Sequence, residues 1–364
     1  MKKKELILIS IQSENREWQT LEPLKEVGIT PDRIYNLRNE GFLQIIYEFL
    51  LVLKLVTLLF WSTVSKQKMV ILTDYYGRKL FYLSLLSKTQ RVYLIHRTRG
   101  NWFEEKEDHD TWKENIFKEL EFKINYNLTK RAFQEIDLFL PVSKWLMESI
   151  GKQIGLYRAN DNYKRIPTPV KLSKYKEKRV YSFDNQMNIL TVRTFTFNKK
   201  FSGLMKFLEK YFLFLEEEDI HIAIAGEGHL RGKSLGKFES ITTELGYVED
   251  MANLYKKYDA LVHFSYLDGY PGVTLEAQAA GLPIIVNNCC GMKEQVKDGK
   301  TGLIVDLNNE EEVKEKLIAL KNSEELRKQL GGNGYNKVRK ENNYKTIGQH
   351  LKEAIEELVG EKIE

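Results

Sequence analysis

The sequence predicts an α/β protein built from two doubly wound domains. Short apolar runs alternate with longer helical patterns along the whole chain, which is typical of parallel sheets covered by helices on both faces. The chain has 364 residues, more than one hydrophobic core usually supports. Residues 166–178 carry two prolines and then a polar, basic stretch, the composition expected of a linker. We therefore place the first domain at residues 1–170 and the second at residues 171–342.

Apolar runs predict the strands of the first domain, at residues 5–10, 69–73, 91–95 and 138–142, with helices in the intervals. One helical interval, residues 42–64, is long enough to span a membrane but carries Gln44, Glu48 and Lys54 along its interior. A charge at the bilayer centre costs about 3 kcal/mol, so a true span is disfavoured. A helix packed on the sheet and a helix lying on a membrane surface both stay open.

The second domain repeats the alternation. Apolar runs predict strands at residues 187–192, 220–225, 260–264, 283–286 and 301–305. Helical patterns follow at residues 310–321, 324–329 and 343–360. The last of these is a candidate for packing back on the first domain.

Composition excludes some classes of function and location. The 56 Lys and Arg against 51 Asp and Glu leave a net charge of +5, too small and too dispersed to indicate nucleic-acid binding. The two cysteines, Cys289 and Cys290, are adjacent and therefore poorly placed for an ordinary disulfide or a four-ligand metal site. The apolar run near the N-terminus is shorter than the core of a signal peptide. We expect a cytoplasmic protein, either free or at the cytoplasmic face of the membrane.

The most informative stretch is residues 265–286, which follows a predicted strand, passes through a Gly/Pro turn and opens a helix. Gly269 and Gly272 let the backbone come close to a ligand, and a helix beginning near Val273 offers unpaired N–H groups to an anion. Glu276 is expected in the first turn of this helix, where a carboxylate can accept hydrogen bonds from a ribose diol. Asp268 lies eight positions earlier, on the loop.

This stretch resembles the signature of glycosyltransferase family 4: an acid, seven residues, a glutamate, and a later Gly-Thr-Pro-like turn, which here is Gly281-Leu282-Pro283. In that family the second acid binds the donor ribose and the first lies by the transferred sugar. The resemblance therefore implies these roles for Glu276 and Asp268. The first acid is usually glutamate, and Asp268 is one methylene shorter.

Further segments agree with the resemblance, in the family's order, and extend it over residues 188–305. Arg193, with Lys199 or Lys200 after it, matches the pair that holds the donor diphosphate, where two fixed cations can stabilise a departing anion without a metal ion. Which lysine takes part stays open. The resemblance also implies donor-binding roles for residues of the segments around 226, 247 and 269, namely Gly226, Gly228, Arg231, Tyr247, Val248, Gly269, Gly272, Val273 and Thr274.

The resemblance implies the GT-B fold, in which two Rossmann-like domains face each other across a cleft, with the acceptor on the first domain. His96 follows a predicted strand and matches a histidine that reaches the cleft in the family, while a hydrogen-bonded histidine without chemistry is the alternative. After it comes a cationic turn with an aromatic residue, suited to an anionic acceptor or simply solvated: Arg97, Arg99, Asn101 and Trp102. The glycine-rich loop that many family members carry after the first strand is replaced here, and Ser13 or Asn15 could take over its contact.

The sequence thus predicts a retaining hexosyltransferase that moves a sugar from a UDP- or GDP-sugar to a hydroxyl of a glycan, glycolipid or lipid-linked acceptor. No cofactor or metal site is expected, and a peripheral membrane contact stays open. Two alternatives remain on the same fold. One is a nucleotide-sugar-binding scaffold without catalysis, and the other is a sugar phosphorylase or epimerase.

Overall fold

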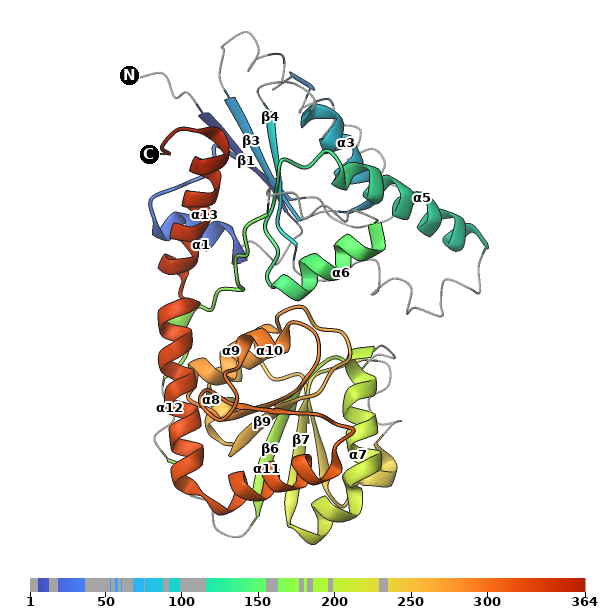
Figure 1. Cartoon of the computed structure of the whole chain (residues 1–364), viewed down its shortest axis with the longest axis vertical. Coiled ribbons are helices and arrows are strands. Elements are labelled where there is room, and N and C mark those ends of the chain that lie inside the picture. The colour runs from blue at the N-terminus through green and yellow to red at the C-terminus, as the bar shows by residue number, and fades with distance from the viewer. Residues whose placement is uncertain are drawn as a thin grey trace. The chain divides into compact units, whose positions relative to one another are not determined.

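The computed structural model divides the chain into two compact units, one of residues 1–167 and 344–364 and one of residues 168–343 (Figure 1). It describes residues 6–12, 19–36, 53, 56, 57, 60, 68–74, 76–87, 92–98, 116–154, 163–176, 180–181, 186–195, 199–228 and 235–363. The α/β prediction is confirmed, because each unit contains a parallel sheet with helices packed on it.

The described strands of the first unit form one sheet in the order β2-β1-β3-β4-β5. They are β1 (Leu6–Gln12), β2 (Arg33–Asn36), β3 (Lys68–Thr73), β4 (Val92–His96) and β5 (Leu138–Phe139). Every pairing among them is parallel. β3 is buried along nearly its whole length, as an apolar run without alternation predicts for a strand covered on both faces.

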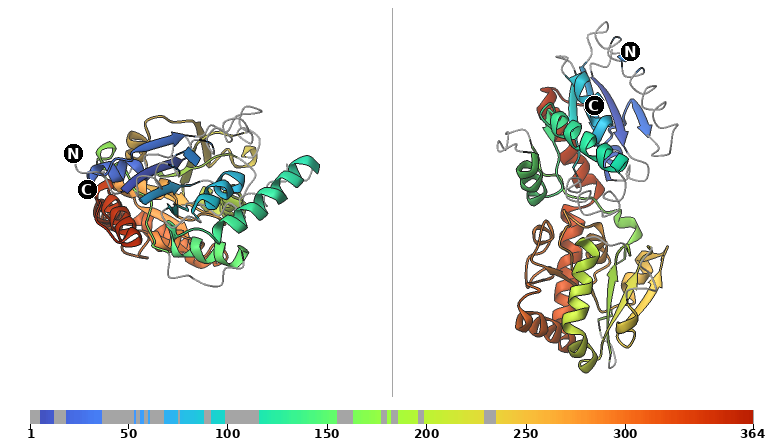
Figure 2. Two further views of the ribbon diagram at one scale, coloured as in Figure 1. Left: turned by 90° about the horizontal axis from the view of Figure 1, so that it is seen from above. Right: turned by 90° about the vertical axis from the view of Figure 1, so that its right-hand side faces the viewer.

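The C-terminal helix belongs to the first unit. The unit's described helices are α1 (Leu21–Glu26), α3 (Gly77–Ser87), α5 (Ile116–Phe133), α6 (Lys144–Ile154) and α13 (Tyr344–Val359). The apolar face of α13 shares a core with β1, β3 and β4, and the helix lies beside α1 (Figures 1 and 2). Gly348 permits this approach, because a Cβ there would lie 1.9 Å from the carbonyl oxygen of Pro23.

The described strands of the second unit form a parallel sheet in the order β11-β10-β9-β6-β7-β8. They are β6 (Met187–Val192), β7 (Ile220–Ala225), β8 (Thr242–Gly246), β9 (Ala260–His263), β10 (Ile284–Asn287) and β11 (Leu303–Val305). Counted from β6, this is the strand order of a dinucleotide-binding fold, which reverses between β6 and β9.

Helices cover both faces of this second sheet. They are α7 (Lys199–Glu217), α8 (Met251–Lys256), α9 (Gly272–Ala279), α10 (Met292–Gln295), α11 (Glu310–Asn322) and α12 (Glu324–Glu341). The first and the last two of these helices share one apolar cluster with the strands, and α8, α9 and α10 share another. Side chains cap the N-termini of three of these helices. Asp250 caps α8, Asn309 caps α11 and Ser323 caps α12, each by accepting a hydrogen bond from a backbone N–H group.

The predicted end of α12 was wrong. The sequence predicts a helix that stops at residue 329, but α12 continues to Glu341 through three glycines. One of them, Gly331, lies against the turn after α9, and a Cβ there would be 2.2 Å from the carbonyl oxygen of Gly281. Close packing of two backbones, rather than helix propensity, therefore explains the glycine.

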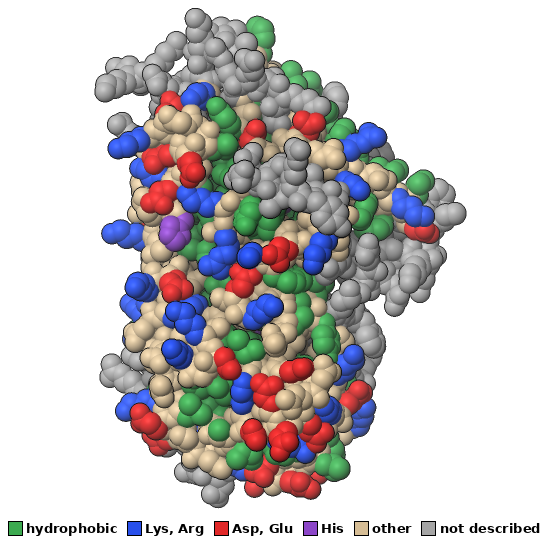
Figure 3. All heavy atoms as spheres, in the orientation of Figure 1, with side chains coloured by type: hydrophobic (Ala, Val, Ile, Leu, Met, Phe, Trp, Pro, Cys, Tyr) green, Lys and Arg blue, Asp and Glu red, His purple; other side chains and the backbone are tan. Residues whose placement is uncertain are grey.

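The segment at residues 42–64 lies outside the described residues except for Leu53, Val56, Thr57 and Phe60, which are helical. Among the described parts of the chain, no helix is long and apolar enough to cross a membrane. On the face drawn in Figure 3, acidic and basic side chains are interspersed over the described surface, in keeping with the dispersed charge of the sequence.

Candidate nucleotide-sugar site

The second unit presents a binding position where its strand order reverses. In open α/β sheets, ligands bind beyond the carboxyl ends of the strands at such a reversal. Here these ends belong to β6 and β9. Arg193 directly follows β6, and the loop of residues 264–271 directly follows β9. The structure therefore brings together two segments that the sequence singled out seventy residues apart.

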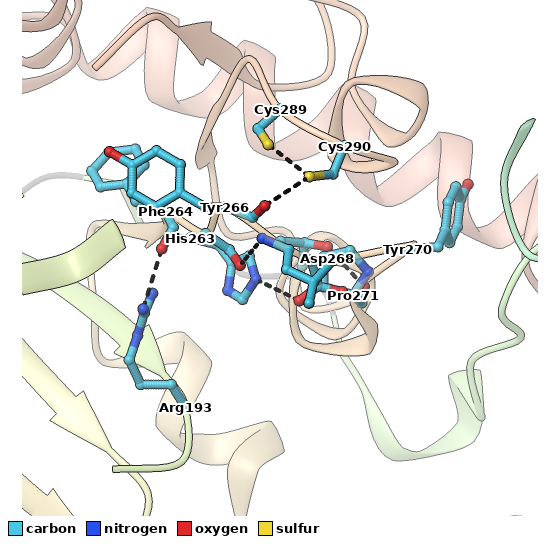
Figure 4. Close-up of polar contacts among 12 residues, drawn as sticks. Arg193, His263, Phe264, Tyr266, Asp268, Tyr270, Pro271, Cys289 and Cys290 are labelled. Atoms are coloured by element: carbon cyan, nitrogen blue, oxygen red, sulfur yellow. Dashed lines mark hydrogen bonds and ion pairs between the residues drawn. The ribbon is translucent and has the colours of Figure 1, made fainter. Parts of the chain in front are cut away.

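Arg193 is fixed by hydrogen bonds to its own strand and to the neighbouring loop. Its Nε and Nη2 donate to Thr191 Oγ1 at 3.2 and 3.0 Å, and its Nη1 donates to the carbonyl oxygen of Phe264 at 3.2 Å (Figure 4). Burial lowers the pKa of Arg193 to about 10, and the charge of Asp268 opposes this shift. The guanidinium is therefore still cationic at neutral pH and is held in one orientation.

Asp268 is held by a histidine from β9. His263 Nε2 lies 3.1 Å from Asp268 Oδ2, with side-chain exposures of 7% and 16% (Figure 4). This contact orients a carboxylate that is shorter than the family's usual glutamate. The negative charge of Asp268 acts on Arg193, so the two predicted site residues interact electrostatically.

Buried amide side chains brace the two ends of the Asp268 loop. At its start, Asn287 on β10 exchanges two hydrogen bonds, each of 2.9 Å, with the backbone of Ser265. At its end, Gln295 Nε2 donates to the carbonyl oxygen of Pro271 at 2.9 Å. Thr274, predicted to bind donor, has its hydroxyl 2.6 Å from Gln295 Oε1 and 2.9 Å from that same carbonyl, so it braces the loop as well.

Helix α9 begins at Gly272, after Pro271, and no acidic residue lies in its first turn. The prediction that Glu276 occupies the first turn is therefore wrong, because the helix begins one residue earlier than expected and Glu276 is its fifth residue. The backbone N–H groups at the helix start remain an anion-binding element. Gly269 is buried in the loop, Val273 is half-buried, and a Cβ on Gly272 would meet open space.

Two tyrosines that the sequence reading missed hold Glu276. Tyr255 on α8 donates its hydroxyl to Glu276 Oε2 at 3.0 Å, and Tyr175 also hydrogen-bonds the carboxylate. Burial raises the pKa of Glu276, while the tyrosine hydroxyls and the charge of Lys174 lower it. Burial and Glu276 in turn raise the pKa of Tyr255 well above its usual value. Sequence spacing gives no signal for these partners, because Tyr255 lies 21 residues before Glu276 and reaches it from another helix.

The glycines after β7 serve close backbone packing. A Cβ on Gly226 would lie 1.8 Å from the carbonyl oxygen of Arg193, and one on Gly228 would lie 2.2 Å from that of Phe195. Because these glycines have no Cβ, the two backbone segments can lie close together. The N–H groups of Arg193 and Phe195 then donate to the carbonyl oxygens of Ala225 and Glu227, each at 2.9 Å. The glycines thus position the Arg193 loop, and their donor-binding role stays a prediction.

The remaining predicted donor residues that the structure describes follow strands of the second sheet. Tyr247, 73% exposed, and the half-buried Val248 follow β8. Lys199 and Lys200 form the first residues of α7, and their side chains are not among those described. Arg231 lies outside the described residues.

The predicted residues of the first unit are less accessible. His96 is completely buried, with Nδ1 2.8 Å from Thr98 Oγ1 and its ring edge-on to Tyr76 at 4.9 Å. Arg97 is also completely buried, and its Nη2 donates to the carbonyl oxygen of Pro167 at 3.1 Å. Both have structural partners, and their roles toward an acceptor stay predictions. The other predicted acceptor residues lie outside the described residues: Ser13, Asn15, Arg99, Asn101 and Trp102.

Within the described residues, no group of three His, Cys, Asp or Glu side chains is placed to hold a metal ion. The positive elements that the structure places at the site are instead the Arg193 guanidinium and the start of α9. Together they can bind a phosphate-bearing ligand.

Residues 174–337 match the family model described as glycosyl transferases group 1. An uncharacterized glycosyltransferase of Methanocaldococcus jannaschii is 33% identical over 128 residues, which is 33% of this chain and 36% of that protein. An enzyme of Campylobacter jejuni is 32% identical over 121 residues, which is 32% of this chain and 34% of the enzyme. Its name is GalNAc-alpha-(1->4)-GalNAc-alpha-(1->3)-diNAcBac-PP-undecaprenol alpha-1,4-N-acetyl-D-galactosaminyltransferase. This chain thus aligns with only about a third of the length of these two relatives.

Solved structures match over nearly the whole chain. HepE of Anabaena, crystallised in complex with UDP, superposes with a TM-score of 0.68 at 14% identity and covers 96% of this chain and 100% of its own. The fold is therefore GT-B, as the resemblance implied.

The raised pKa of Glu276 gives protein stability a pH dependence of defined sign. Between the ordinary carboxyl pKa of 4.5 and the raised value, the folded protein holds a proton that the unfolded chain has released. The free energy of unfolding of the wild type should therefore fall, relative to that of Glu276→Gln, as pH rises through this window. Urea unfolding of both proteins at a series of pH values measures the difference. A difference that is constant, or that changes in the opposite direction, would contradict the burial of this carboxyl.

Proposed function

We propose that this chain, whose residues 174–337 belong to the glycosyl transferases group 1 family, is a retaining hexosyltransferase that uses a nucleotide-sugar donor. The observation that carries the proposal is the fixed Arg193 guanidinium at the reversal of strand order, beside the loop of Asp268. Such a position is where a parallel α/β sheet binds a nucleotide.

The donor diphosphate lies, in this proposal, between Arg193 and the start of α9. A guanidinium held by three hydrogen bonds loses little freedom when it binds an anion, so its charge is available to a departing diphosphate. Lys199 or Lys200, at the start of α7, supplies a second cation. With positive charge supplied by the protein, we expect transfer to need no metal ion.

Glu276 accepts hydrogen bonds from the donor ribose in this proposal. Tyr255 occupies Oε2, and carboxylate oxygens have further lone pairs for ligand hydroxyls. The raised pKa of Glu276 reflects burial, and hydrogen bonds from a diol would favour the charged form. Asp268, oriented by His263, takes the place beside the transferred sugar.

Transfer with retention follows from the family's chemistry. The glycosidic bond to the diphosphate breaks while Arg193 stabilises the charge on the leaving group. The departing phosphate oxygen takes the proton of the acceptor hydroxyl, which attacks the same face of the sugar. The carboxylate of Asp268 then lies beside the positive charge that develops on the sugar ring.

The acceptor in this proposal is a lipid-linked glycan held by the first domain, residues 1–170. The name of the Campylobacter relative specifies an undecaprenol-diphosphate-linked glycan as its acceptor, and HepE was crystallised with UDP. A UDP-hexose donor and a polyprenyl-diphosphate-linked acceptor are therefore our first choice for assay. A catalytic role for His96 of the first domain is part of the proposal.

A lipid-linked acceptor makes peripheral membrane contact part of the proposal. Leu53, Val56 and Phe60 are helical, exposed and spaced at intervals that place them on one helix face. Apolar side chains on one face of an exposed helix can enter the interfacial region of a bilayer.

Loss of either proposed donor-binding side chain, Arg193 or Glu276, should slow transfer without unfolding the protein. Arg193→Ala and Glu276→Gln should each reduce kcat/KM at least tenfold, about 1.4 kcal/mol of transition-state stabilisation. Arg193→Lys keeps the charge but loses the forked hydrogen bonds, so its kcat/KM should lie between that of Arg193→Ala and that of the wild type. Arg339→Ala removes an exposed arginine of the same unit and should leave transfer unchanged.

Release of nucleoside diphosphate from donor and acceptor measures these effects, after a thermal-stabilisation screen of UDP- and GDP-sugars has chosen the donor. Full activity in both Arg193→Ala and Glu276→Gln would refute the site. Donor binding with no turnover on any acceptor tested would favour the scaffold alternative.

Membrane contact is tested by flotation with anionic liposomes at low salt. The wild type should float with the vesicles, and the triple change Leu53→Ser, Val56→Ser and Phe60→Ser should stay at the bottom of the gradient, since the apolar face is lost. The control is Leu213→Ser, which removes an exposed leucine of α7 in the second unit. Failure of the wild type to float would contradict the proposed contact.

A further inference from the structure

The two cysteines of the chain lie side by side on the turn after β10. Their Sγ atoms are 2.6 Å apart, against about 2.05 Å in a formed disulfide. The turn itself brings them together: the Cys289 N–H donates to the carbonyl oxygen of Asn287 at 2.7 Å, and Cys290 adopts a φ of 57°, which is uncommon for a residue with a side chain. Neither cysteine forms a disulfide in this structure.

This turn also holds the Asp268 loop in place. Cys290 Sγ donates to the carbonyl oxygen of Tyr266 at 3.3 Å and accepts from the backbone N–H of Asp268. The N–H of the next residue, Gly291, donates to the carbonyl oxygen of Asp268 at 3.0 Å. Figure 4 shows the two thiols, the backbone of Tyr266 and Asp268 in one connected group.

The two thiols differ in environment. Cys290 is buried, and the hydrogen bond with Cys289 together with burial raises its pKa, so it stays a thiol at neutral pH. Cys289 is partly exposed and is the sulfur that a reagent in solution can reach.

We propose that Cys289 and Cys290 form a redox-sensitive dithiol, closed to a disulfide by hydroperoxides, that controls the Asp268 loop. The Cys289 thiolate attacks the peroxide, giving a sulfenic acid and releasing hydroxide or alkoxide. The sulfur of Cys290 then attacks the sulfenic sulfur, and its proton leaves with the hydroxyl as water. In sum, two thiols lose two electrons and two protons, and one peroxide bond is reduced.

Oxidation removes the proton that Cys290 donates to Tyr266. The partly buried carbonyl oxygen of Tyr266 then loses that hydrogen bond, and the sulfur moves toward Cys289 and away from the Asp268 N–H. The loop that carries Asp268 is therefore less well fixed in the disulfide form. This consequence for ligand binding rests on the proposed function, whereas disulfide formation does not.

Intact mass spectrometry of the full chain tests the covalent step. After treatment with hydrogen peroxide, the wild type should be a monomer lighter by two hydrogen atoms, should resist iodoacetamide and should recover two alkylatable thiols in dithiothreitol. Because the chain has only two cysteines, any internal disulfide must be this one. Persistence of two alkylatable thiols, oxidation of Cys289 to a sulfinic acid with Cys290 still free, or chains linked as dimers would overturn the proposal.

Nucleotide affinity tests the link to the loop, with UDP as the probe. The oxidised wild type should bind UDP about tenfold more weakly than the reduced form, the size expected when a partly buried hydrogen bond is lost. The matched control, Cys289→Ser, keeps the contacts of Cys290 with Tyr266 and Asp268 and should bind UDP equally well before and after peroxide. If the disulfide forms and the affinity for UDP does not change, the proposal that the dithiol controls the Asp268 loop is refuted. If neither form binds UDP while the mass change occurs, the proposed function fails and the dithiol stands.

Discussion

The proposed site of the second unit depends on one cationic side chain, that of Arg193, which is held in a fixed orientation at the end of β6. Arg193 is half-buried, and its guanidinium donates hydrogen bonds to Thr191 and to the carbonyl oxygen of Phe264. Asp268, on the loop that follows β9, interacts electrostatically with Arg193. The position where the strand order reverses therefore holds both a cation and an anion in fixed places. A preformed positive group of this kind stabilises an anion without rearranging when the anion develops.

Much of the surrounding architecture serves to keep that loop in place. Asn287 fixes one end of it and Gln295 fixes the other, while His263 orients its carboxylate. The Cys289-Cys290 turn then binds the middle through the backbone of Tyr266 and Asp268. Because nearly every support is a buried polar group with a specific partner, small chemical changes in the support can alter the position of the carboxylate.

Sequence reasoning predicted the strands that are continuous apolar runs, such as β6 and β7, within a residue or two. It missed β2 and β8, which are short edge strands with few apolar residues, and for β8 only the last residue is buried. Short motifs and their resemblance to a known family singled out Arg193, Asp268 and Glu276 as candidates, because the residues of each motif are local in sequence. It could not identify His263 or Tyr255 as their partners, since these contacts depend on packing between separate elements.

In the proposed site, the carboxyl ends of β6 and β9 bind the phosphates of a nucleotide sugar. A crystal structure of the chain with UDP tests this most directly. Diphosphate oxygens are expected within hydrogen-bond distance of the Arg193 guanidinium, with ribose hydroxyls on Glu276. Nucleotide bound elsewhere, with no phosphate oxygen on the Arg193 guanidinium, would refute this assignment.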